Sequence, residues 1–417
     1  MSLAKNLGVV LFLGLVRRGE FETLQSRGLP LAILVDKNNR QRLGDVSRFV
    51  LVQEFDFSRP IGDLIEAVRE IEVRWGIACL FNVIEFYVAQ TADVALALRL
   101  PFISPDAARL CLDKNLMRTR FQERMGAGHA ARFFPVESEA ELLNFADQLG
   151  YPVFLQPANV SASMWATRNA DPSVLLQNYR RLVAEVPKYY EKLGKKETKL
   201  AIALAEYLEG ANYSVDCVGD RQGEIHTTPV VDVLTGKDIG IDDYHHFARL
   251  VPSRLSDEKQ KELQRLAVAG MRALEMHTCS AHVEFIGSRL GEIAARPGGN
   301  RPRILELAFG IDLLHGYFQA LMGGKPDLQA TKNLAAAIIT PFPSTSGSLR
   351  SIRHLEDIPR LPTYLYHEIR GQTGQAVGLA KNGCRSPLYI ELKSEDAEAV
   401  RRDVDLIASW TDLYEIE

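Results

Sequence analysis

The chain has 417 residues, 46% of them hydrophobic and 24% charged, and its formal net charge is −4. This length exceeds what one ordinary hydrophobic core takes up, so two or three domains are expected. The composition is that of a soluble globular protein, and the small negative charge gives no reason to expect a nucleic acid or an anionic membrane as partner.

The first hundred residues alternate apolar, strand-like runs with amphipathic stretches. In order, they predict a strand at residues 9–15, a helix at 19–26, strands at 31–35 and 50–53, and a helix at 61–75. Such alternation predicts a doubly wound parallel sheet. The turn at residues 14–19 lacks the tight glycine spacing of a dinucleotide-binding fingerprint, so we place no nucleotide on this domain.

Cysteine usage and the first apolar run bear on the compartment. The five cysteines are widely scattered and include no Cys-x-x-Cys pair, which favours a reducing cytoplasm over a disulfide framework or a zinc site. The apolar run at residues 7–16 is too short to span a bilayer and has no small-residue cleavage site, so we expect a buried strand and not a signal peptide.

The middle of the chain predicts a long helix followed by shorter strands and helices. The helices are expected at residues 106–125, 171–184 and 256–274, and the strands at 151–157, 200–208 and 213–219. Ser256 is the expected N-cap of its helix, and the polar run at 191–199 is expected to be a loop. From about residue 340 we expect strands at 364–369, 376–379 and 388–392 and a final helix at 395–410.

Two glutamates near residue 290 carry the strongest chemical signal. Side chains alternate along a strand, so Glu284 lies on one face of the run at 280–286, and Glu292 lies on one face of the run that follows. A three-residue turn at 287–289 would place Glu284 across from Glu292, with their β-carbons roughly 5 Å apart. Two carboxylates this close, with Arg296 on the same face, suit Mg²⁺ that also binds phosphate and water. An exposed hairpin with a charged outer face is the alternative.

Other segments, taken in order, give this pair a context. They are Asp113-Lys114 at a helix start, a strand and small-residue loop at 151–163, a strand and turn at 205–210 followed by 213–216, and then the two glutamate runs with Arg296, Gly298 and Gly299. In this order the chain resembles the ATP-grasp superfamily, in particular its carboxylate-amine ligases and among them the L-amino-acid (dipeptide) ligase group.

The resemblance implies an α/β architecture, α+β in part, over nearly the whole chain. An N-terminal domain with a doubly wound parallel sheet is expected at residues 1–105, and an ATP-grasp domain at 106–341 with a mobile lid at about 118–205. A small C-terminal α/β domain is expected at 342–417. The implied cofactors are ATP and Mg²⁺, with Mn²⁺ as a substitute.

The resemblance also assigns nucleotide and metal roles. Lys114 would bind the ATP phosphates and take part in catalysis, and the loop at residues 159–164 would close over them. Glu284 and Glu292 would be the metal ligands. The remaining residues implied for the nucleotide are Gln156, Ser161, Ser163, Met164, Glu206, Tyr207, Leu208 and Asn212. Outside the family context, Asp113-Lys114 would be an ordinary helix start and 206–208 an ordinary core strand.

Substrate roles follow in the same way. Arg296 would bind the acyl-phosphate and the tetrahedral intermediate, and the backbone amides of Gly298 and Gly299 would approach the same anion. A polar segment that resembles the one near the substrates of dipeptide ligases contains Asp243, His245, His246 and Arg249, of which His246 and Arg249 are assigned to the substrate. A polar surface loop is the alternative for this segment. Asp312 is expected to be a helix cap.

Several positions depart from the family pattern, and all of them concern ATP. Gln156 stands where a lysine normally binds the α- and β-phosphates, and a lost cation weakens a charge-assisted contact. Ala205 replaces an acidic residue before the hinge, Asn212 replaces the ribose-binding glutamate, and Ala294 replaces an asparagine between the metal site and Arg296.

Two functions are compatible with these residues. The first is an ATP-dependent ligase that joins small-molecule carboxylate and amine substrates of amino-acid type through an acyl-phosphate, releasing ADP and phosphate. The second is a degenerate ATP-grasp protein with a binding or regulatory role. A ligase like biotin carboxylase or those of purine biosynthesis is a further option, but no biotin-attachment sequence and no glycine-rich carboxylase loop is present. A homodimer is a reasonable expectation for the superfamily.

Overall fold

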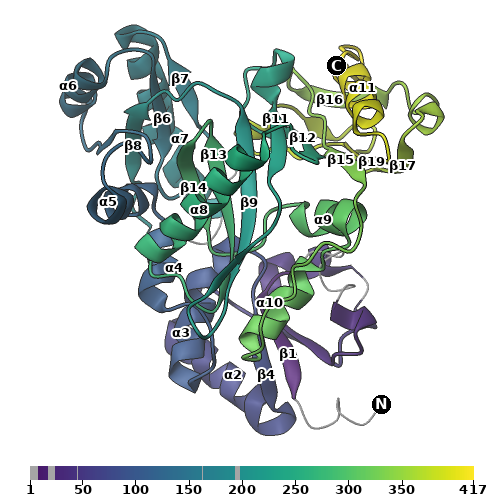
Figure 1. The fold of residues 1–417 in the computed structure, drawn as a ribbon. Helices are drawn as coiled ribbons and strands as arrows, with labels where there is room; N and C mark the ends of the chain where they lie inside the picture. The colour runs from purple at the N-terminus through teal and green to yellow at the C-terminus, as the bar shows by residue number, and fades with distance from the viewer. Residues whose placement is uncertain (1–7, 17–23, 45, 162, 193–197) are drawn as a thin grey trace.

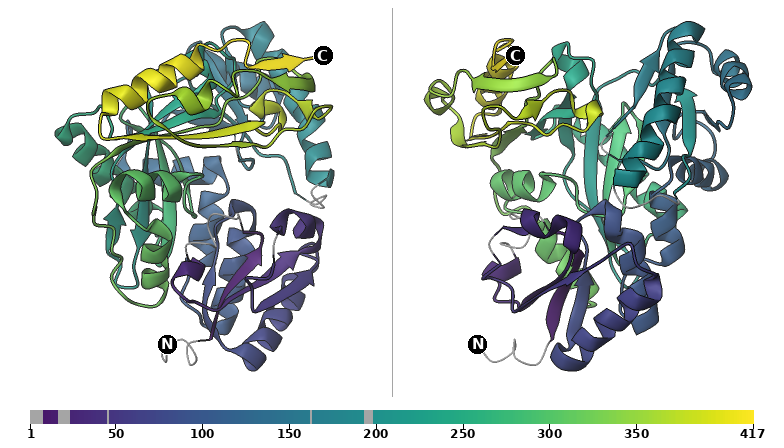
Figure 2. Two further views of the ribbon diagram at one scale, coloured as in Figure 1. Left: turned by 90° about the vertical axis from the view of Figure 1, so that its right-hand side faces the viewer. Right: turned by 180° about the vertical axis from the view of Figure 1, so that it is seen from behind.

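The computed structural model describes residues 8–16, 24–44, 46–161, 163–192 and 198–417 (Figure 1). Three bodies are visible: an N-terminal domain at the bottom of Figure 1, a lid at the upper left, and a large sheet that runs between them to the C-terminal elements (Figures 1 and 2). The predicted helix at 19–26 and the polar loop at 191–199 fall largely outside the described residues.

The N-terminal domain is a four-stranded parallel sheet, which confirms the predicted architecture. Its strands are β1 (Val9–Gly14), β2 (Leu31–Asp36), β3 (Leu51–Phe55) and β4 (Ile77–Phe81), in the order β3-β2-β1-β4. Helices α2 (Ile61–Trp75) and α3 (Val88–Leu98) pack on one face. The other face packs on α10 (Leu313–Leu321), where the rings of Phe81 and Tyr317 are 4.6 Å apart. The second face is therefore covered partly by a later part of the chain.

The continuous helix predicted at residues 106–125 is wrong, whereas the predicted helix start at Asp113-Lys114 is confirmed. The structure has two helices, α4 (Pro105–Cys111) and α5 (Lys114–Met125). Asp113 between them has extended backbone angles (φ −133°, ψ 113°), and its carboxylate accepts hydrogen bonds from the amides of Asn115 and Leu116 at 2.8 and 3.2 Å. A capping side chain starts a new helix here, because it satisfies amides that the first turn leaves unpaired. Lys114 thus becomes the first residue of α5.

The lid is a small α/β unit with its own core. Its sheet has the order β5-β8-β6-β7, and a shared apolar core includes Leu142, Leu155, Leu182 and Leu204. The elements are β5 (Phe133–Pro135), α6 (Glu139–Leu149), β6 (Val153–Pro157), β7 (Thr167–Asn169), α7 (Pro172–Lys192) and β8 (Ile202–Glu206). Figure 1 shows this unit standing apart from the N-terminal domain, with α5 beside it.

The body is built on an antiparallel sheet of nine strands in the order β14-β13-β9-β11-β12-β15-β19-β17, with β10 beside β9. The strands are β9 (Asn212–Gly219), β10 (Ile225–Thr227), β11 (Val231–Thr235), β12 (His246–Val251), β13 (Cys279–Ile286), β14 (Arg289–Ala294), β15 (Ala335–Ile339), β17 (Tyr364–Ile369) and β19 (Leu388–Ser394). Helix α8 (Asp257–Ala273) packs on one face through Leu263, Ala267 and Met271. Ser256 caps it as predicted, since its hydroxyl accepts from the amide of Lys259.

The C-terminal elements continue this sheet. Strands β17 and β19 pair with it through β15, so the predicted boundary near residue 341 falls inside one continuous sheet. The predicted strands at 364–369, 376–379 and 388–392 and the final helix are present. Besides β17 and β19, the elements are β16 (Gly347–Ile352), β18 (Ala376–Val377), the short helix η6 (Ala380–Asn382), α11 (Ala397–Ala408) and β20 (Tyr414–Ile416). Helix α9 (Arg301–Phe309) precedes α10, which Asp312 caps as expected.

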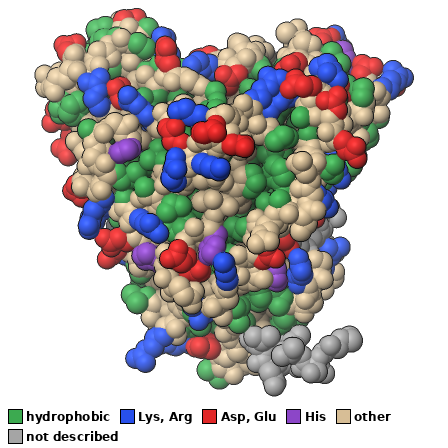
Figure 3. Space-filling view, viewed as in Figure 1, with side chains coloured by type: hydrophobic (Ala, Val, Ile, Leu, Met, Phe, Trp, Pro, Cys, Tyr) green, Lys and Arg blue, Asp and Glu red, His purple; other side chains and the backbone are tan. Residues whose placement is uncertain are grey.

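The distribution of charged side chains on the surface agrees with the small net charge of −4. Lysine and arginine are interspersed with aspartate and glutamate on the face seen in Figure 3, and neither sign dominates it. All five cysteines are free thiols, and all but Cys384 are buried. None of the described helices combines the length and the apolar character that crossing a bilayer requires.

The cap at Asp113 gives a first prediction. Asp113→Ala should expose the amides of Asn115 and Leu116, at a cost of about 1 kcal/mol, so that their hydrogen exchange becomes about fivefold faster. Asp396→Ala is the matched control, because Asp396 accepts from the amides of Glu398 and Ala399 at 2.9 and 3.2 Å at the start of α11. Unchanged exchange at Asn115 and Leu116 would show that α5 does not depend on this cap.

Candidate active site

The glutamate hairpin has the predicted register but not the predicted turn. Glu284 on β13 lies directly opposite Glu292 on β14. Ile286 pairs with Arg289, so the turn consists of Gly287 and Ser288 alone, and the expected three-residue turn is wrong. The extra residue sits instead in a bulge at Gly291, between the pairs Phe285–Leu290 and Glu284–Glu292. Two deviations of one residue cancel, and the carboxylates stay opposite each other.

The two faces of this hairpin are as expected. Val283, Phe285 and Ile293 are buried in the core under α8, whereas Glu284, Glu292 and Arg296 line a cavity of about 1690 Å³ on the other face. The side chains of Glu284 and Glu292 are 37% and 22% exposed, so a ligand in the cavity can reach both. The cavity is bounded by the N-terminal domain, the lid, the body and the C-terminal elements.

Glu292 contacts Lys114, the lysine that the resemblance assigns to the ATP phosphates. Lys114 Nζ lies 3.2 Å from Glu292 Oε2 and donates to the carbonyl of Val160 at 3.0 Å. Burial, together with the negative charges of Glu85 and Glu284, raises the pKa of Glu292 although Lys114 opposes the shift. The carboxylate therefore lacks full compensation by protein cations, and an added cation would stabilise its charged form.

Glu284 is positioned by two histidines. His282 Nε2 is 3.1 Å from Glu284, and His282 Nδ1 is 3.1 Å from the fully buried Asp216. His246 Nε2 lies 3.6 Å from Glu284. Burial raises the pKa of Glu284, but His246, His282 and Arg301 lower it by more, so the pKa lies well below its usual value. These neighbours thus stabilise the ionised form of Glu284.

The tautomer of His246 follows from its other neighbour. Arg301 Nη2 is 3.3 Å from His246 Nδ1, and a guanidinium can only donate. Nδ1 must accept, so the proton of a neutral His246 is on Nε2, facing Glu284. Arg301 is itself 1% exposed and also donates to Ser214 Oγ and to the carbonyl of Gly299. It orders the segment that follows Arg296, and the sequence did not single it out.

Arg296 meets a carboxylate from another domain. Its Nη2 donates to Glu85 Oε2 at 2.9 Å, and Glu85 belongs to the short helix η3 (Glu85–Tyr87) of the N-terminal domain. Burial lowers the pKa of Arg296, but Glu85 and Glu284 raise it by more. Glu85 also lines the cavity. No motif around residue 85 indicated this role, because the contact depends on how two domains pack.

The glycines after Arg296 fit a crowded backbone. The amide of Gly298 donates to Asp216 Oδ1 at 2.7 Å, so it serves the buried Asp216 in this structure, while Gly299 lines the cavity. A β-carbon at Gly298 would lie 2.4 Å from His282 Nδ1. Asp216, His282 and Gly298 therefore form one tightly packed unit beneath Glu284.

The residues predicted for the nucleotide lie on the lid and at its junction with the body. Gln156 is a buried residue of β6 and pairs with Ala203 of β8. Glu206 ends β8, and its carboxylate accepts from Arg132 Nε at 2.9 Å and also contacts Arg289. These two arginines hold the carboxylate side chain, and the backbone amide of Glu206 donates to the carbonyl of Arg132 at 2.9 Å.

Tyr207 is surrounded by cations and by other aromatic rings. Arg168 and Lys237 lie 5.1 and 4.9 Å from its ring centroid, and Lys237 donates to its hydroxyl. Leu208 follows it, and Asn212 begins β9 opposite Ile286 of the glutamate hairpin. Ser163 and Met164 line the cavity that contains Glu292, whereas the other predicted nucleotide residues are not among its lining residues. A nucleotide bound as the resemblance implies would follow a path from the hinge at 206–208 toward Glu292.

The predicted loop at 159–164 links lid, α5 and C-terminal elements. Asn159 accepts from Tyr190 Oη at 2.6 Å, and the carbonyl of Val160 accepts from Lys114. Ser161 and Ser163 are exposed, Ser163 and Met164 line the cavity, and Ala162 lies outside the described residues. The next amide, that of Trp165, donates to the carbonyl of Lys381 at 3.3 Å. The lid therefore touches η6 across the cavity.

In the polar segment near residue 245, one residue holds two loops together and the others line the cavity. Asp243 is buried and accepts from the amides of Lys381 and His245, so it joins two loops. His246 and Arg249 line the cavity, as does His245, whose ring lies 4.2 Å from that of Phe342 at a tilt of 55°. Arg249 donates to Thr340 at 2.6 Å, and burial, followed by the charge of Arg301, lowers the pKa of Arg249 to about 9.

The carboxylate pair fits a metal ion that also has other ligands. Mg²⁺ is usually bound by one or two carboxylates plus phosphate oxygens and waters. Within the described part of the chain, no three His, Cys, Asp or Glu side chains converge on one metal position. Glu284 and Glu292 would supply two oxygen ligands. The raised pKa of Glu292 supports such a site, because a bound cation would lower that pKa.

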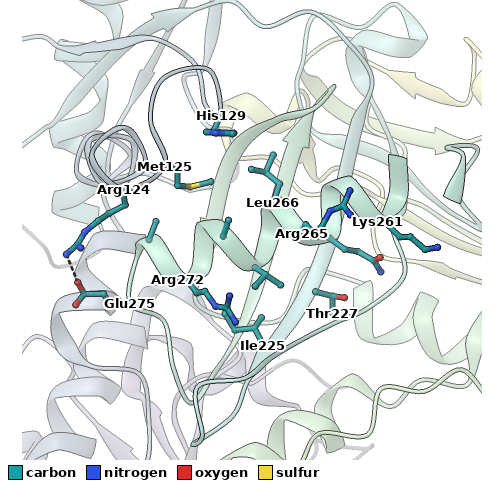
Figure 4. Close-up of a pocket in the computed structure, with 14 residues that line it drawn as sticks. Arg124, Met125, His129, Ile225, Thr227, Lys261, Arg265, Leu266, Arg272 and Glu275 are labelled. Atoms are coloured by element: carbon teal, nitrogen blue, oxygen red, sulfur yellow. Dashed lines mark hydrogen bonds and ion pairs between the residues drawn. The ribbon is translucent and has the colours of Figure 1, made fainter. Parts of the chain in front are cut away.

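A second hollow, of about 930 Å³, lies between the C-terminal end of α5 and the outer side of α8 (Figure 4). Arg124, Lys261, Arg265 and Arg272 border it beside apolar side chains such as Leu266, and Arg124 pairs with Glu275 at 3.3 Å. None of the predicted site residues lines it.

Comparison with known proteins gives the site a family context. Residues 149–298 match the model of the ATP-grasp domain, a span that includes Gln156, Glu284, Glu292 and Arg296. The L-amino acid ligase from Bacillus licheniformis has a similar structure, with a TM-score of 0.83 and 17% sequence identity over 99% of both chains.

The curated relatives match over a smaller part of the chain. An uncharacterized protein, y4rH, of Sinorhizobium fredii is 23% identical over 72% of this chain, and a D-alanine–D-alanine ligase of Thermoanaerobacter is 23% identical over 48% of it. The chain spans 60% and 56% of the lengths of these two relatives.

The packing at Gly298 gives a second prediction. Gly298→Ala should destabilise the protein by about 1–3 kcal/mol, because His282 is fixed between Asp216 and Glu284 and cannot move away from the new methyl group. Gly62→Ala is the control, since a β-carbon there meets nothing within 4 Å in helix α2. Thermal unfolding measures both, and equal midpoints for the two variants would refute the packing argument.

Proposed function

We propose that this chain, an ATP-grasp protein by its domain and its fold, is an ATP-dependent ligase that joins a carboxylate to an amine. The observation that carries this proposal is the convergence of the Glu284–Glu292 pair and Arg296 on one cavity, with Lys114 in contact with Glu292. Each of these groups is expensive to bury, so their presence favours chemistry over folding. The substrates are small molecules of amino-acid type.

The residues fall into roles that suit acyl-phosphate formation. Bound Mg²⁺ would neutralise charge on the ATP phosphates. Lys114 is placed to bind the same phosphates, next to Glu292. Arg296 is placed to bind the acyl-phosphate and the tetrahedral anion that forms when the amine attacks it, because its guanidinium opens onto the cavity. His282 and His246 keep Glu284 ionised and oriented.

Glu85 suggests how the amine side is recognised. Its carboxylate lies on Arg296 and faces the same cavity from the N-terminal domain. A substrate carboxylate that binds Arg296 would compete with this contact, and a substrate ammonium would find Glu85 within reach. The pair therefore matches a substrate with both charges, which is the property of an amino acid.

The lid would keep water from the reactive intermediate. Trp165 and Arg181 of the lid bond to Lys381 and Asn382 of the C-terminal elements, at 3.3 and 3.1 Å. These contacts join the lid to the C-terminal elements beside the cavity and would hold the lid closed. Closure of this kind excludes hydrolysis of an acyl-phosphate before an amine arrives.

The altered nucleotide positions favour one other function. Gln156, Ala205 and Asn212 are all on the side that would bind ATP, so a protein that binds ligands without turning over ATP is the alternative. The two functions differ in whether ADP is released in an amine-dependent reaction.

Release of ADP from ATP, Mg²⁺ and a pool of amino acids tests the ligase. Glu292→Gln should lower the rate by about 100-fold or more, because it removes one charged ligand from the metal and phosphate site. Glu275→Gln is the control, since Glu275 lies on the surface beside Arg124. Absence of amine-dependent ADP release in the unmodified protein, with every acid and amine tried, would refute the ligase and favour the binding protein.

Gln156 gives a further prediction. Gln156→Lys should tighten ADP binding by about tenfold, because it adds a charge-assisted contact where the present side chain offers a neutral donor. Gln156→Met, which removes the donor without adding charge, is the control and should not tighten binding. Calorimetric titration with ADP measures both; affinities that are the same in all three proteins would show that position 156 does not face the phosphates.

A further inference from the structure

Arg118 on α5 is a buried cation with unsatisfied hydrogen-bonding groups. The residue is 7% exposed, and within the residues that the structure describes its Nε and Nη1 atoms have no hydrogen-bond partner. No described carboxylate forms an ion pair with it. Its guanidinium carbon lies 5.9 Å from the ring centroid of Phe133.

This arrangement is costly for the protein alone. A buried guanidinium normally pairs with an anion and fills its donors, because the desolvation cost is otherwise not offset. Burial lowers the pKa of Arg118 to about 10, and the charge of Glu292 offsets only part of the effect. A cation kept in such surroundings is expected to have a partner that binds from outside the chain.

The position of Arg118 indicates which ligand could supply that partner. It follows Lys114 by one helical turn, and the two side chains share the buried face of α5. At one end of this face Lys114 contacts Glu292. At the other, Phe133 of β5 pairs with Ala205, the residue before the hinge at 206–208. Arg118 thus lies between the metal pair and the hinge, along the path proposed for the nucleotide.

Gln156, which stands where the family normally has a lysine, lies beside the same path. Gln156 lies on β6, paired with Ala203 of the strand that ends at the hinge. Asn115, on the same first turn of α5 as Lys114, donates to the carbonyl of Ile202 on that strand at 3.1 Å. Helix α5 and strand β6 therefore approach the nucleotide path from the same side, through β8. Residue 118 on α5 and residue 156 on β6 thus lie on elements that both pack against β8.

We propose that Arg118 binds the phosphate chain of the nucleotide directly and supplies the positive charge that Gln156 lacks. This inference rests on the proposed function only in requiring that a nucleotide binds between lid and body. It does not require that a peptide bond is formed.

Calorimetric titration with ADP, and with adenosine as a probe without phosphates, tests the role. Arg118→Met should weaken ADP binding by about tenfold or more and leave adenosine binding unchanged, because a charge-assisted contact to phosphate is lost. Arg118→Lys should keep part of the ADP affinity. Arg124→Met is the matched control on the same helix, since Arg124 is exposed and pairs with Glu275.

Two further measurements separate binding from folding. Without ligand, Arg118→Met should unfold at the same or a higher temperature, because an unpaired buried cation has been replaced by an apolar side chain. Gln156→Lys should tighten ADP binding by a larger factor in the Arg118→Met background than alone, because the two cations would serve the same phosphates.

Three results would overturn the inference. They are equal ADP affinities in Arg118→Met and the unmodified protein, an equal loss of ADP and adenosine binding, and a marked drop in the unfolding temperature of Arg118→Met without ligand. A protein that binds ADP through Arg118 but makes no amide would refute the ligase and leave the inference standing. A protein that binds no ADP at all would refute both.

Discussion

The pairing of Glu284 with Glu292 across two strands is the constraint on which the rest of the site depends. Two carboxylates side by side in a partly desolvated cavity repel each other, so each needs cations nearby. The protein divides this task unequally. Glu284 is surrounded by His246, His282 and Arg301 and its pKa is lowered, whereas among the described residues Glu292 forms an ion pair with Lys114 alone and its pKa is raised. The unequal compensation leaves room for one more cation at Glu292, next to the lysine proposed to bind phosphate.

The sequence could predict whatever depended on local periodicity. Alternation along β13 and β14 placed Glu284, Glu292 and Arg296 on one face, and the parallel N-terminal sheet followed from its alternating elements. The same reasoning failed at Asp113. Periodicity predicted one continuous helix at residues 106–125, but the backbone at Asp113 is extended and its side chain caps a second helix. The turn of the hairpin was also wrong, yet the register survived because the bulge at Gly291 restored the spacing that a longer turn would have provided.

Contacts between distant segments could not be predicted in this way. Glu85 and Arg296 are 211 residues apart and come from different domains, so no spacing links them. The buried unit of Asp216, His282 and Gly298 joins three segments of the chain. The sequence placed residues of this unit in separate motifs, but it did not indicate that they contact one another. Arg118 had no signal either. In the sequence it is one of many arginines on a helix, and only its burial without a partner distinguishes it.

Arg118 also changes the interpretation of the part of the site that is predicted to bind the nucleotide, where three residues depart from the family pattern. Substitutions at residues 156, 205 and 212 look like decay if each position is judged alone. A decayed site would be free to lose costly features, because nothing would oppose the replacement of an unpaired buried cation by an apolar side chain that stabilises the fold. Arg118 remains buried and unpaired beside that part of the site. Its retention is better explained by a ligand that binds there than by the needs of folding, and the charge at the phosphates is then relocated to α5 and not lost.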